Sequence, residues 1–380
     1  MKLPFMVRKP ILACGADLKG AFALAKGDAA FLYEGFGDLS DLGNFERYEN
    51  AVSKAIKKTG IKPAVIAHDM HPGYFSTRFA EDFAQKSQRA ALYAIQHHEA
   101  HVASCIVDND IKGSVIGVAF DGTGYGLDGN IWGGEFFIGS VKGFKRAAHL
   151  EYVPMPGGDA AIRQPWRMAV SYLYTARHSE AAKRPKNLKA RSFGSSLRDS
   201  PQDDRKISRA AFIIDMIEKK INSPLTSSAG RLFDAAASLV LRKDTADFEA
   251  ELPIALEKIV DRNCDESYTA ALPSDSAGII KRVAADVDRK VDSGIISARF
   301  HNTVSGMIAQ TAKRLCKQYR AKKIVLSGGV FQNKFLSEKT VDMLNGGGFS
   351  VYTHKNISTT DSGIPVGQIA IANARCRIEK

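Results

Sequence analysis

The sequence has few cysteines, and none of them are spaced to bind a structural metal. It contains five, scattered through 380 residues, with no CxxC pair. The odd total and irregular spacing argue against a disulfide framework and a zinc ribbon, so a reducing, cytoplasmic setting fits best. Long apolar runs are also lacking, and the first residues lead into no sustained apolar segment. We therefore expect neither a secretion signal nor a membrane span.

What remains is a composition ordinary for a globular protein, with 44% hydrophobic and 25% charged residues. The length suffices for two or three compact domains. The net charge of +12 would suit a polyanionic partner, but much of the excess lies between Arg177 and Arg209, where aromatic residues are nearly absent. Bases need aromatic stacking platforms. We therefore favour a solvated loop over docking to RNA or to an acidic protein, and we disfavour nucleic acid as a partner.

The segment from Gln96 to His101 carries the clearest chemical signal. His97 and His101 are four residues apart, so a helix would place both imidazoles on one face, as two ligands of one metal would lie. An isolated pair of this kind is more often a surface or core pair. Here an Asp-Gly-Thr-Gly loop at Asp121 follows, and an Asp-Ser-Gly turn at Asp361 lies near the C-terminus. Either aspartate could add an oxygen ligand, and Asp361 could equally cap the next helix.

The order of predicted elements favours an α/β fold. Apolar runs at 11–14, 21–25 and 30–33 predict an antiparallel meander, after which strands and helices alternate. A second series begins with the strand at 115–120, and the recurrence of the same strand-turn unit predicts an internal duplication with a cleft between the halves. A mostly helical insertion extends to about residue 319, and the α/β pattern returns at 323–326.

Glycine-rich turns are the candidate phosphate sites. In the turn after residue 120, Gly124 frees the backbone to approach a ligand and the Thr123 hydroxyl can bond a phosphoryl oxygen. Gly328 and Gly329 form a tight turn that leads through Asn333 into a helix, whose N-terminal amides would face a nucleotide.

Two further loops carry polar residues near these turns. Asp159 stands at a predicted helix start, one turn before Arg163, and could equally be only an N-cap. Asp69 and His71 follow a buried strand, where ligands tend to bind in α/β sheets. For these two residues a plain turn is the more common role.

Together these segments resemble the C-terminal, Kae1-like, carbamoyl-transferring region of HypF, the maturation protein of nickel-iron hydrogenases. The resemblance runs from about residue 10 to about residue 375. It rests on ordered motifs: GAD, HDMHPGY, QHHEAH, FDGTGYG, WGGE, PMPGGDAAIRQPWRMA, TSSAGRLFDA, ARFHN, LSGGVFQN and DSGIPVGQ. That region belongs to the actin-like (ASKHA) superfamily. It is similar to the universal tRNA threonylcarbamoyladenosine synthase and to antibiotic O-carbamoyltransferases.

The resemblance implies an actin-like duplicated fold with two α/β subdomains, and we place the boundaries at 1–115, 116–320 and 321–380. It implies iron or zinc as the metal, with His97, His101 and Asp361 as ligands and catalytic residues and Asp121 as the fourth ligand. It also implies that carbamoyl-adenylate, with its AMP moiety derived from ATP, binds in the cleft. The residues that would contact it are Thr123, Gly124, Asp159, Arg163, Gly328, Gly329 and Asn333.

The implied reaction is carbamoyl transfer to the C-terminal cysteine of HypE, on the route to the cyanide ligand of the hydrogenase. HypF proteins usually also carry CxxC zinc modules and a YrdC-like domain that makes carbamoyl-adenylate, and those motifs do not occur here. We therefore expect either an isolated domain or a stand-alone relative supplied by a separate YrdC-like synthase. Two alternatives stay open: a nucleotide-binding or docking subunit, and carbamoylation of another acceptor such as a small molecule or tRNA.

Overall fold

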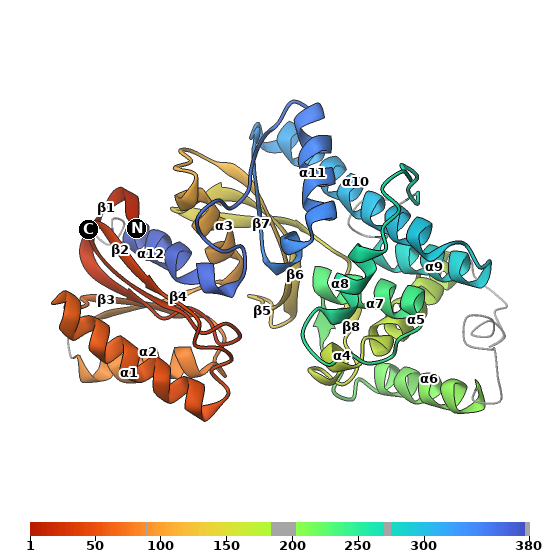
Figure 1. Ribbon diagram of the computed structural model, residues 1–380, viewed down its shortest axis with the longest axis horizontal. Coiled ribbons are helices and arrows are strands. Elements are labelled where there is room, and N and C mark those ends of the chain that lie inside the picture. The colour runs from red at the N-terminus through yellow and green to blue at the C-terminus, as the bar shows by residue number, and fades with distance from the viewer. Residues whose placement is uncertain (88–89, 184–202, 270–274, 377–380) are drawn as a thin grey trace.

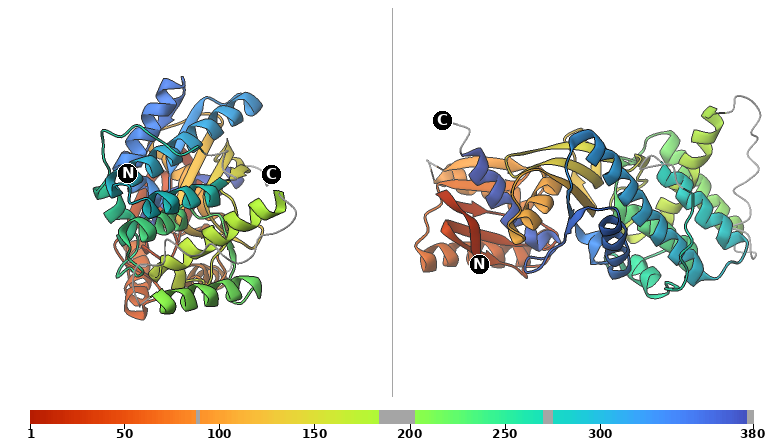
Figure 2. Two further views of the ribbon diagram at one scale, coloured as in Figure 1. Left: turned by 90° about the vertical axis from the view of Figure 1, so that its right-hand side faces the viewer. Right: turned by 90° about the horizontal axis from the view of Figure 1, so that it is seen from above.

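The chain folds around two β-sheets, with a block of helices beyond the second (Figure 1). The computed structural model describes residues 1–87, 90–183, 203–269 and 275–376. Seen from above, the molecule is elongated, with the first sheet at one end and the helical block at the other (Figure 2). The central part of the basic stretch predicted as a loop lies outside the described residues.

The first subdomain contains a four-stranded sheet that is antiparallel at one edge and parallel elsewhere. Its strands, in spatial order, are β2 (Phe22–Tyr33), β1 (Lys2–Ala13), β3 (Val65–Asp69) and β4 (Ala91–Ile95). The sequence predicts separate strands at 21–25 and 30–33, and the structure joins them into β2. The chain continues there because Gly27 pairs with Val7 at an irregular point in the register, so that no turn forms.

Helices cover both faces of this sheet. Side chains alternate along β1, so that Ile11 and Ala13 contact one core and Leu12 contacts the other. The first core is shared with α3 (His97–Asp108) and α12 (Ile364–Arg375), the second with α1 (Leu42–Thr59) and α2 (Phe75–Lys86). α12, near the C-terminus, therefore packs on the first sheet, whose strands come from the N-terminal part of the chain (Figure 1).

The second subdomain contains a sheet of seven strands within the described residues, parallel on one side and mixed on the other. Its path runs through β11 (Ser350–Tyr352), β10 (Lys323–Ser327), β5 (Val115–Tyr125), β6 (Ile131–Ser140), β9 (Leu225–Thr226) and β8 (Val153–Pro154), with β7 (Gly143–His149) beside β6. Two 3-10 turns follow strands of this part, η2 (Gly329–Gln332) and η3 (Asp361–Gly363).

Helix α3 lies between the two subdomains, where it packs on α12 of the first and on β5, β6 and β10 of the second. Ala100 and Ala103 belong to the core of the first subdomain, whereas Val102 and Cys105 pack against β5 and β6. The approach is close on both sides. A Cβ on Gly367 of α12 would lie 1.9 Å from the Ala100 carbonyl oxygen, and one on Gly117 of β5 would lie 2.6 Å from Val102. These two glycines let α3 sit at the centre of the molecule.

The predicted helical insertion follows β8 and forms the block of helices at one end of the molecule (Figure 1). Its members are α4 (Ala160–Arg163), α5 (Trp166–Lys183), α6 (Asp203–Glu218), α7 (Ala229–Leu241), α8 (Glu251–Lys258) and α9 (Ser276–Asp288). α10 (Ser293–Tyr319) leads back to β10, and α11 (Lys334–Gly346) lies between β10 and β11. The predicted α/β class, with two subdomains and a mostly helical insertion, is confirmed. Among the described helices, none combines the length and the apolar character needed to cross a membrane.

Candidate metal centre and ligand cavity

The two histidines of the HxxxH motif lie in the first two turns of α3, as the spacing predicts. Gln96 caps this helix by accepting a hydrogen bond from the Glu99 amide. The rings of His97 and His101 have their centroids 5.0 Å apart, and both side chains are buried. His98 lies between them in sequence but packs near Trp132, so it is not a member of the pair.

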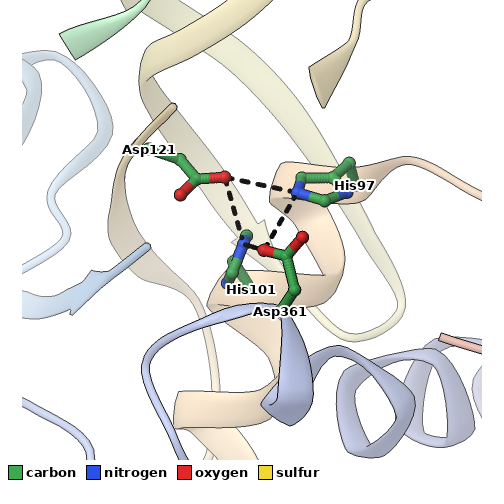
Figure 3. Close-up of side chains that lie close together, drawn as sticks. All are labelled: His97, His101, Asp121 and Asp361. Carbon is green, nitrogen blue, oxygen red and sulfur yellow. Dashed lines mark hydrogen bonds and ion pairs between the residues drawn. The ribbon is translucent and has the colours of Figure 1, made fainter. Parts of the chain in front are cut away.

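Asp121 and Asp361 complete a cluster of four side chains (Figure 3). His97 Nε2 lies 3.3 Å from Asp121 Oδ2 and 3.7 Å from Asp361 Oδ1, and His101 Nε2 lies 3.4 Å from each of these oxygens. Asp361 is the first residue of η3, and the N-cap positions of η3 and α12 are held by Thr360 and Gly363 instead. The geometry therefore favours a place in the cluster over a helix cap as the role of Asp361.

The cluster fits a metal ion on two independent grounds. Bonds of about 2.0–2.1 Å to a tetrahedral zinc ion would separate neighbouring ligand atoms by roughly 3.3 Å, which is close to the four distances above. Neither ring nitrogen of the buried His101 has a hydrogen-bond partner among the described residues. Two imidazole nitrogens and two carboxylate oxygens are donors that suit zinc or ferrous iron.

Charge in the cluster is balanced between imidazoles and carboxylates. Burial by itself would lower the pKa of His97, but the carboxylates of Asp69 and Asp361 outweigh it and raise this pKa well above its usual value. The pKa of His101 is likewise raised, because Asp121 outweighs burial. Burial favours the neutral form of Asp121, yet the two histidines hold its pKa well below the usual range.

Asp69 orients the first histidine. Its Oδ2 accepts a hydrogen bond of 2.7 Å from His97 Nδ1, and its Oδ1 accepts one of 2.9 Å from the His71 amide. Because a carboxylate only accepts, Nδ1 carries the proton and Nε2 is left as the nitrogen that faces the two aspartates. The sequence places Asp69 at the end of a buried strand, and that position is the only signal that could have assigned it this role.

A cavity of about 500 Å³ opens beside the cluster, between the two subdomains. Leu18 and Lys19 line it from the first subdomain, and residues 121–123 of β5 line it from the second together with α7, α8 and η2. The sequence predicts a turn after residue 120, but β5 continues to Tyr125 because it resumes pairing with β6 beyond an irregularity in the register. Its size falls in the range of small-molecule and cofactor sites. The predicted central cleft is therefore present, and the metal cluster lies at its wall.

The predicted ligand contacts divide into two groups. Of the residues predicted to contact the nucleotide, Thr123, Gly329 and Asn333 line the cavity, beside Asp121 and Asp361, which were predicted as metal ligands. The Gly329 amide donates to Asp121 Oδ1 at 2.9 Å, so this turn also holds a member of the metal cluster.

The remaining predicted contacts lie elsewhere. Gly124 packs beneath the histidines, where a Cβ would lie 2.5 Å from His98 Cε1 and 3.0 Å from His97 Cδ2. Gly328 (φ 101°) lies against Phe120, with no room for a Cβ. Asp159 and Arg163 are exposed and do not line the cavity, and Asp159 makes no side-chain cap. Their contacts with the nucleotide stay predictions.

One pair of cavity residues was missed by the sequence reasoning. Arg231 and Asp234 on α7 are buried, with Arg231 Nε 2.9 Å from Asp234 Oδ2. Burial raises the pKa of Asp234 to about 6 even though Arg231 opposes the shift. The TSSAGRLFDA motif could have indicated this pair, because two charged residues stand there within a run of small and apolar residues.

Two family profiles together span most of the chain. The HypF Kae1-like domain matches residues 7–108, and the second subdomain of the carbamoyltransferase Kae1-like domain matches residues 117–368. The chain belongs to the HypF carbamoyltransferase family. This confirms the resemblance seen in the sequence motifs.

Two curated HypF relatives illustrate the extent of the match. The carbamoyltransferase HypF homolog of Cupriavidus necator is 31% identical over 376 residues, which cover 96% of this chain and 91% of the relative. Carbamoyltransferase HypF of Synechocystis is 31% identical over 383 residues, covering 97% of this chain but 48% of the relative. The chain therefore spans about half the length of most of the curated relatives it matches.

Solved HypF structures share the fold. Full-length HypF in the phosphate- and nucleotide-bound form superposes with a TM-score of 0.86 at 33% identity, covering 98% of this chain and 56% of that one. HypF of T. kodakarensis gives a TM-score of 0.85 at 25% identity, with coverage of 99% and 49%.

Proposed function

We propose that this chain is a metal-dependent carbamoyltransferase that moves a carbamoyl group from carbamoyl-adenylate to an acceptor. The observation that carries the proposal is the meeting of His97, His101, Asp121 and Asp361 at the wall of a ligand-sized cavity. Membership of the HypF family supports the reaction class. The bound phosphate and nucleotide of a HypF relative support an adenylate as the occupant of the cavity.

The four side chains of the cluster would hold one zinc or iron ion. Such an ion would supply Lewis acidity to a phosphate or carbamoyl oxygen. Asp69 fixes the ring of His97, and the Gly329 amide fixes the carboxylate of Asp121. Thr123 offers a hydroxyl to the adenylate from the C-terminal part of β5. Because these groups are held by the fold before a ligand arrives, they lose little freedom on binding it.

The acceptor brings the nucleophile in this proposal. Among the described residues that line the cavity there is no cysteine, and burial raises the pKa of Cys14 to about 12. The thiolate of a C-terminal cysteine, as on a HypE-like protein, would attack the carbamoyl carbon. The new C–S bond forms as the C–O bond to the phosphate breaks, and AMP leaves. A separate YrdC-like synthase would supply the carbamoyl-adenylate.

The test combines metal analysis with an acceptor assay. Purified protein is supplied with carbamoyl-adenylate and a HypE-like protein ending in cysteine, and mass spectrometry follows carbamoylation of that residue. His97→Ala and Asp361→Ala should each lose the bound metal and the transfer activity. His178→Ala, which removes an exposed histidine on α5, should keep both. Full transfer by a metal-free His97→Ala protein would refute the proposal.

A second candidate is a nucleotide-binding or docking subunit without activity of its own. The cavity between the two subdomains would serve such a subunit as a nucleotide-binding site. The same assay separates the two, because a docking subunit would bind AMP and the acceptor protein without carbamoylating it. Carbamoylation of tRNA instead would appear as product on tRNA and as binding that weakens steeply with salt.

A further inference from the structure

A buried histidine outside the metal cluster is linked to the cavity through one of its lining residues. His301 on α10 is fully buried, and the edges of Phe233, Phe300 and Phe335 surround its ring. Its Nε2 lies 2.9 Å from Nδ2 of Asn333, which lines the cavity at the start of α11. The proposed function leaves this histidine without a role.

The backbone groups that bond Asn333 and His301 decide which atom donates in the hydrogen bond between these two side chains. Asn333 Oδ1 accepts from the Leu336 amide at 2.8 Å, so the oxygen of the side-chain amide faces the helix and its nitrogen faces His301. At the other end, His301 Nδ1 lies 2.8 Å from the Ser297 carbonyl oxygen, which can only accept. Nδ1 therefore carries the proton, and Nε2 accepts from Asn333.

The ring stays in this state at neutral pH. Burial lowers the pKa of His301 to about 4, although the Ser297 carbonyl opposes the shift. A neutral ring with its proton on Nδ1 always offers a lone pair to Asn333. Two bonds, one to each end of the amide, then fix the plane of the Asn333 side chain. One N–H of that amide remains without a partner among the described residues, at a position that lines the cavity.

We propose that His301 is a positioning residue, which holds the Asn333 amide so that it presents an N–H donor to an acceptor atom of the bound nucleotide. This inference rests on the proposed function, since it takes an adenine nucleotide as the occupant of the cavity. It adds a residue from α10, which does not itself line the cavity, to the machinery that sets nucleotide affinity.

The experiment measures AMP binding to the full chain by calorimetry, together with the thermal unfolding midpoint. His301→Leu removes the acceptor at nearly the same volume and should weaken AMP binding about tenfold, the worth of one hydrogen bond to a buried group. His301→Gln keeps a side-chain carbonyl that can accept from Asn333, and it should bind within about threefold of the wild type. His149→Leu is the matched control, because His149 also bonds a backbone carbonyl through Nδ1 but does not line the cavity.

A double-mutant cycle separates positioning from general damage. If His301 acts through Asn333, adding His301→Leu to Asn333→Ala should cause no further loss of AMP affinity. Additive losses, or equal losses in the Leu and Gln variants, would overturn the inference. Should the Leu variant not fold, His301→Ala takes its place. Recovery of AMP binding on adding imidazole would then support the inference, and no recovery would count against it. A wild-type protein that binds no AMP would instead contradict the proposed function, and with it the nucleotide site.

Discussion

At the scale of single residues, Asp69 decides which nitrogen of His97 is available to a metal. Its carboxylate accepts from two N–H groups at once, the His97 ring and the His71 backbone. The side chain at this position must accept one hydrogen bond with each of two oxygens, and only a carboxylate can do so. The buried Asp69 would therefore contribute to the affinity for a metal ion without being a ligand in the cluster.

Replacing Asp69 with asparagine should weaken metal binding by about ten- to a hundredfold. An amide offers its oxygen to only one of the two N–H groups, and the backbone amide of His71 cannot reverse its polarity. The amide nitrogen would then face His97 Nδ1, the ring proton would move to Nε2, and that nitrogen could no longer bind a metal. Competition with a chelating dye measures the metal dissociation constant.

The control for this prediction is Asp82→Asn, which changes an exposed carboxylate on α2 and should bind metal as the wild type does. Equal metal affinity in Asp69→Asn and the wild type would contradict the orienting role of Asp69. A loss of folded protein would be visible separately in the circular dichroism spectrum.

At the scale of elements, the C-terminal part of β5 supports the histidines as well as the cavity. Gly124 lies so close to His98 and His97 that any side chain there would push into their rings. The hairpin of β5 and β6 is itself anchored by Glu135, which is buried and bonded to Arg146 at 2.6 Å. That bond ties β6 to β7, and the close contact of Gly117 with Val102 holds β5 against α3.

We expect Gly124→Ala to destabilise the protein by about 1 to 3 kcal/mol and to lower metal affinity, because the added methyl group displaces His97. Chemical denaturation gives the free energy of unfolding, and dye competition gives the metal affinity. Gly143→Ala is the control, since a Cβ there meets nothing within 4 Å and should change neither quantity. Unchanged metal binding in Gly124→Ala would show that the histidines tolerate the shift.

The contact of α3 with α12 sets the distance between Asp361 and the two histidines of the site. α12 follows directly after η3, which carries Asp361, and α3 carries the histidines. Because Gly367 touches the Ala100 carbonyl, the separation of the two helices also sets how far Asp361 lies from the imidazoles.

Gly367→Ala should separate α12 from α3 and so cost about 3 kcal/mol of unfolding free energy, with a loss of metal affinity. Gly346→Ala, at the end of α11 in open space, is the matched control and should leave both quantities unchanged. A Gly367→Ala protein as stable as the wild type would mean that the helices can shift without strain.

At the scale of the whole molecule, the candidate metal site joins parts of the chain that are far apart in sequence. His97 and His101 come from α3, Asp121 from β5 and Asp361 from η3. These elements belong to the two subdomains and to the helix between them. An ion bound there would hold the subdomains in one arrangement.

Metal removal should therefore lower the thermal stability of the intact chain. At a zinc concentration about a hundred times the dissociation constant, binding should add about 2.7 kcal/mol to the free energy of unfolding. Differential scanning calorimetry with zinc and with a chelator measures the difference in unfolding midpoint. His97→Ala should show no such difference, and a shift of the same size in that variant would place the stabilising ion elsewhere.

Periodicity and turn residues predicted a large part of this fold. The spacing of His97 and His101 predicted that both lie on one face of a helix, and that helix is α3, from His97 to Asp108. Alternating strands and helices predicted the two α/β subdomains, the cleft and the helical insertion. These features depend on local patterns of a few residues, which a sequence displays directly.

The sequence by itself determined the residue types that could bind a metal and the local elements that carry them. Only the tertiary structure decided that Asp361 lies within 3.4 Å of His101 and that α12 packs on the first sheet. It also decided that Asp69 orients His97 and that His301 bonds Asn333. The physical reason is that these contacts join segments far apart in the chain, and their distances depend on how whole helices and sheets pack rather than on any local pattern.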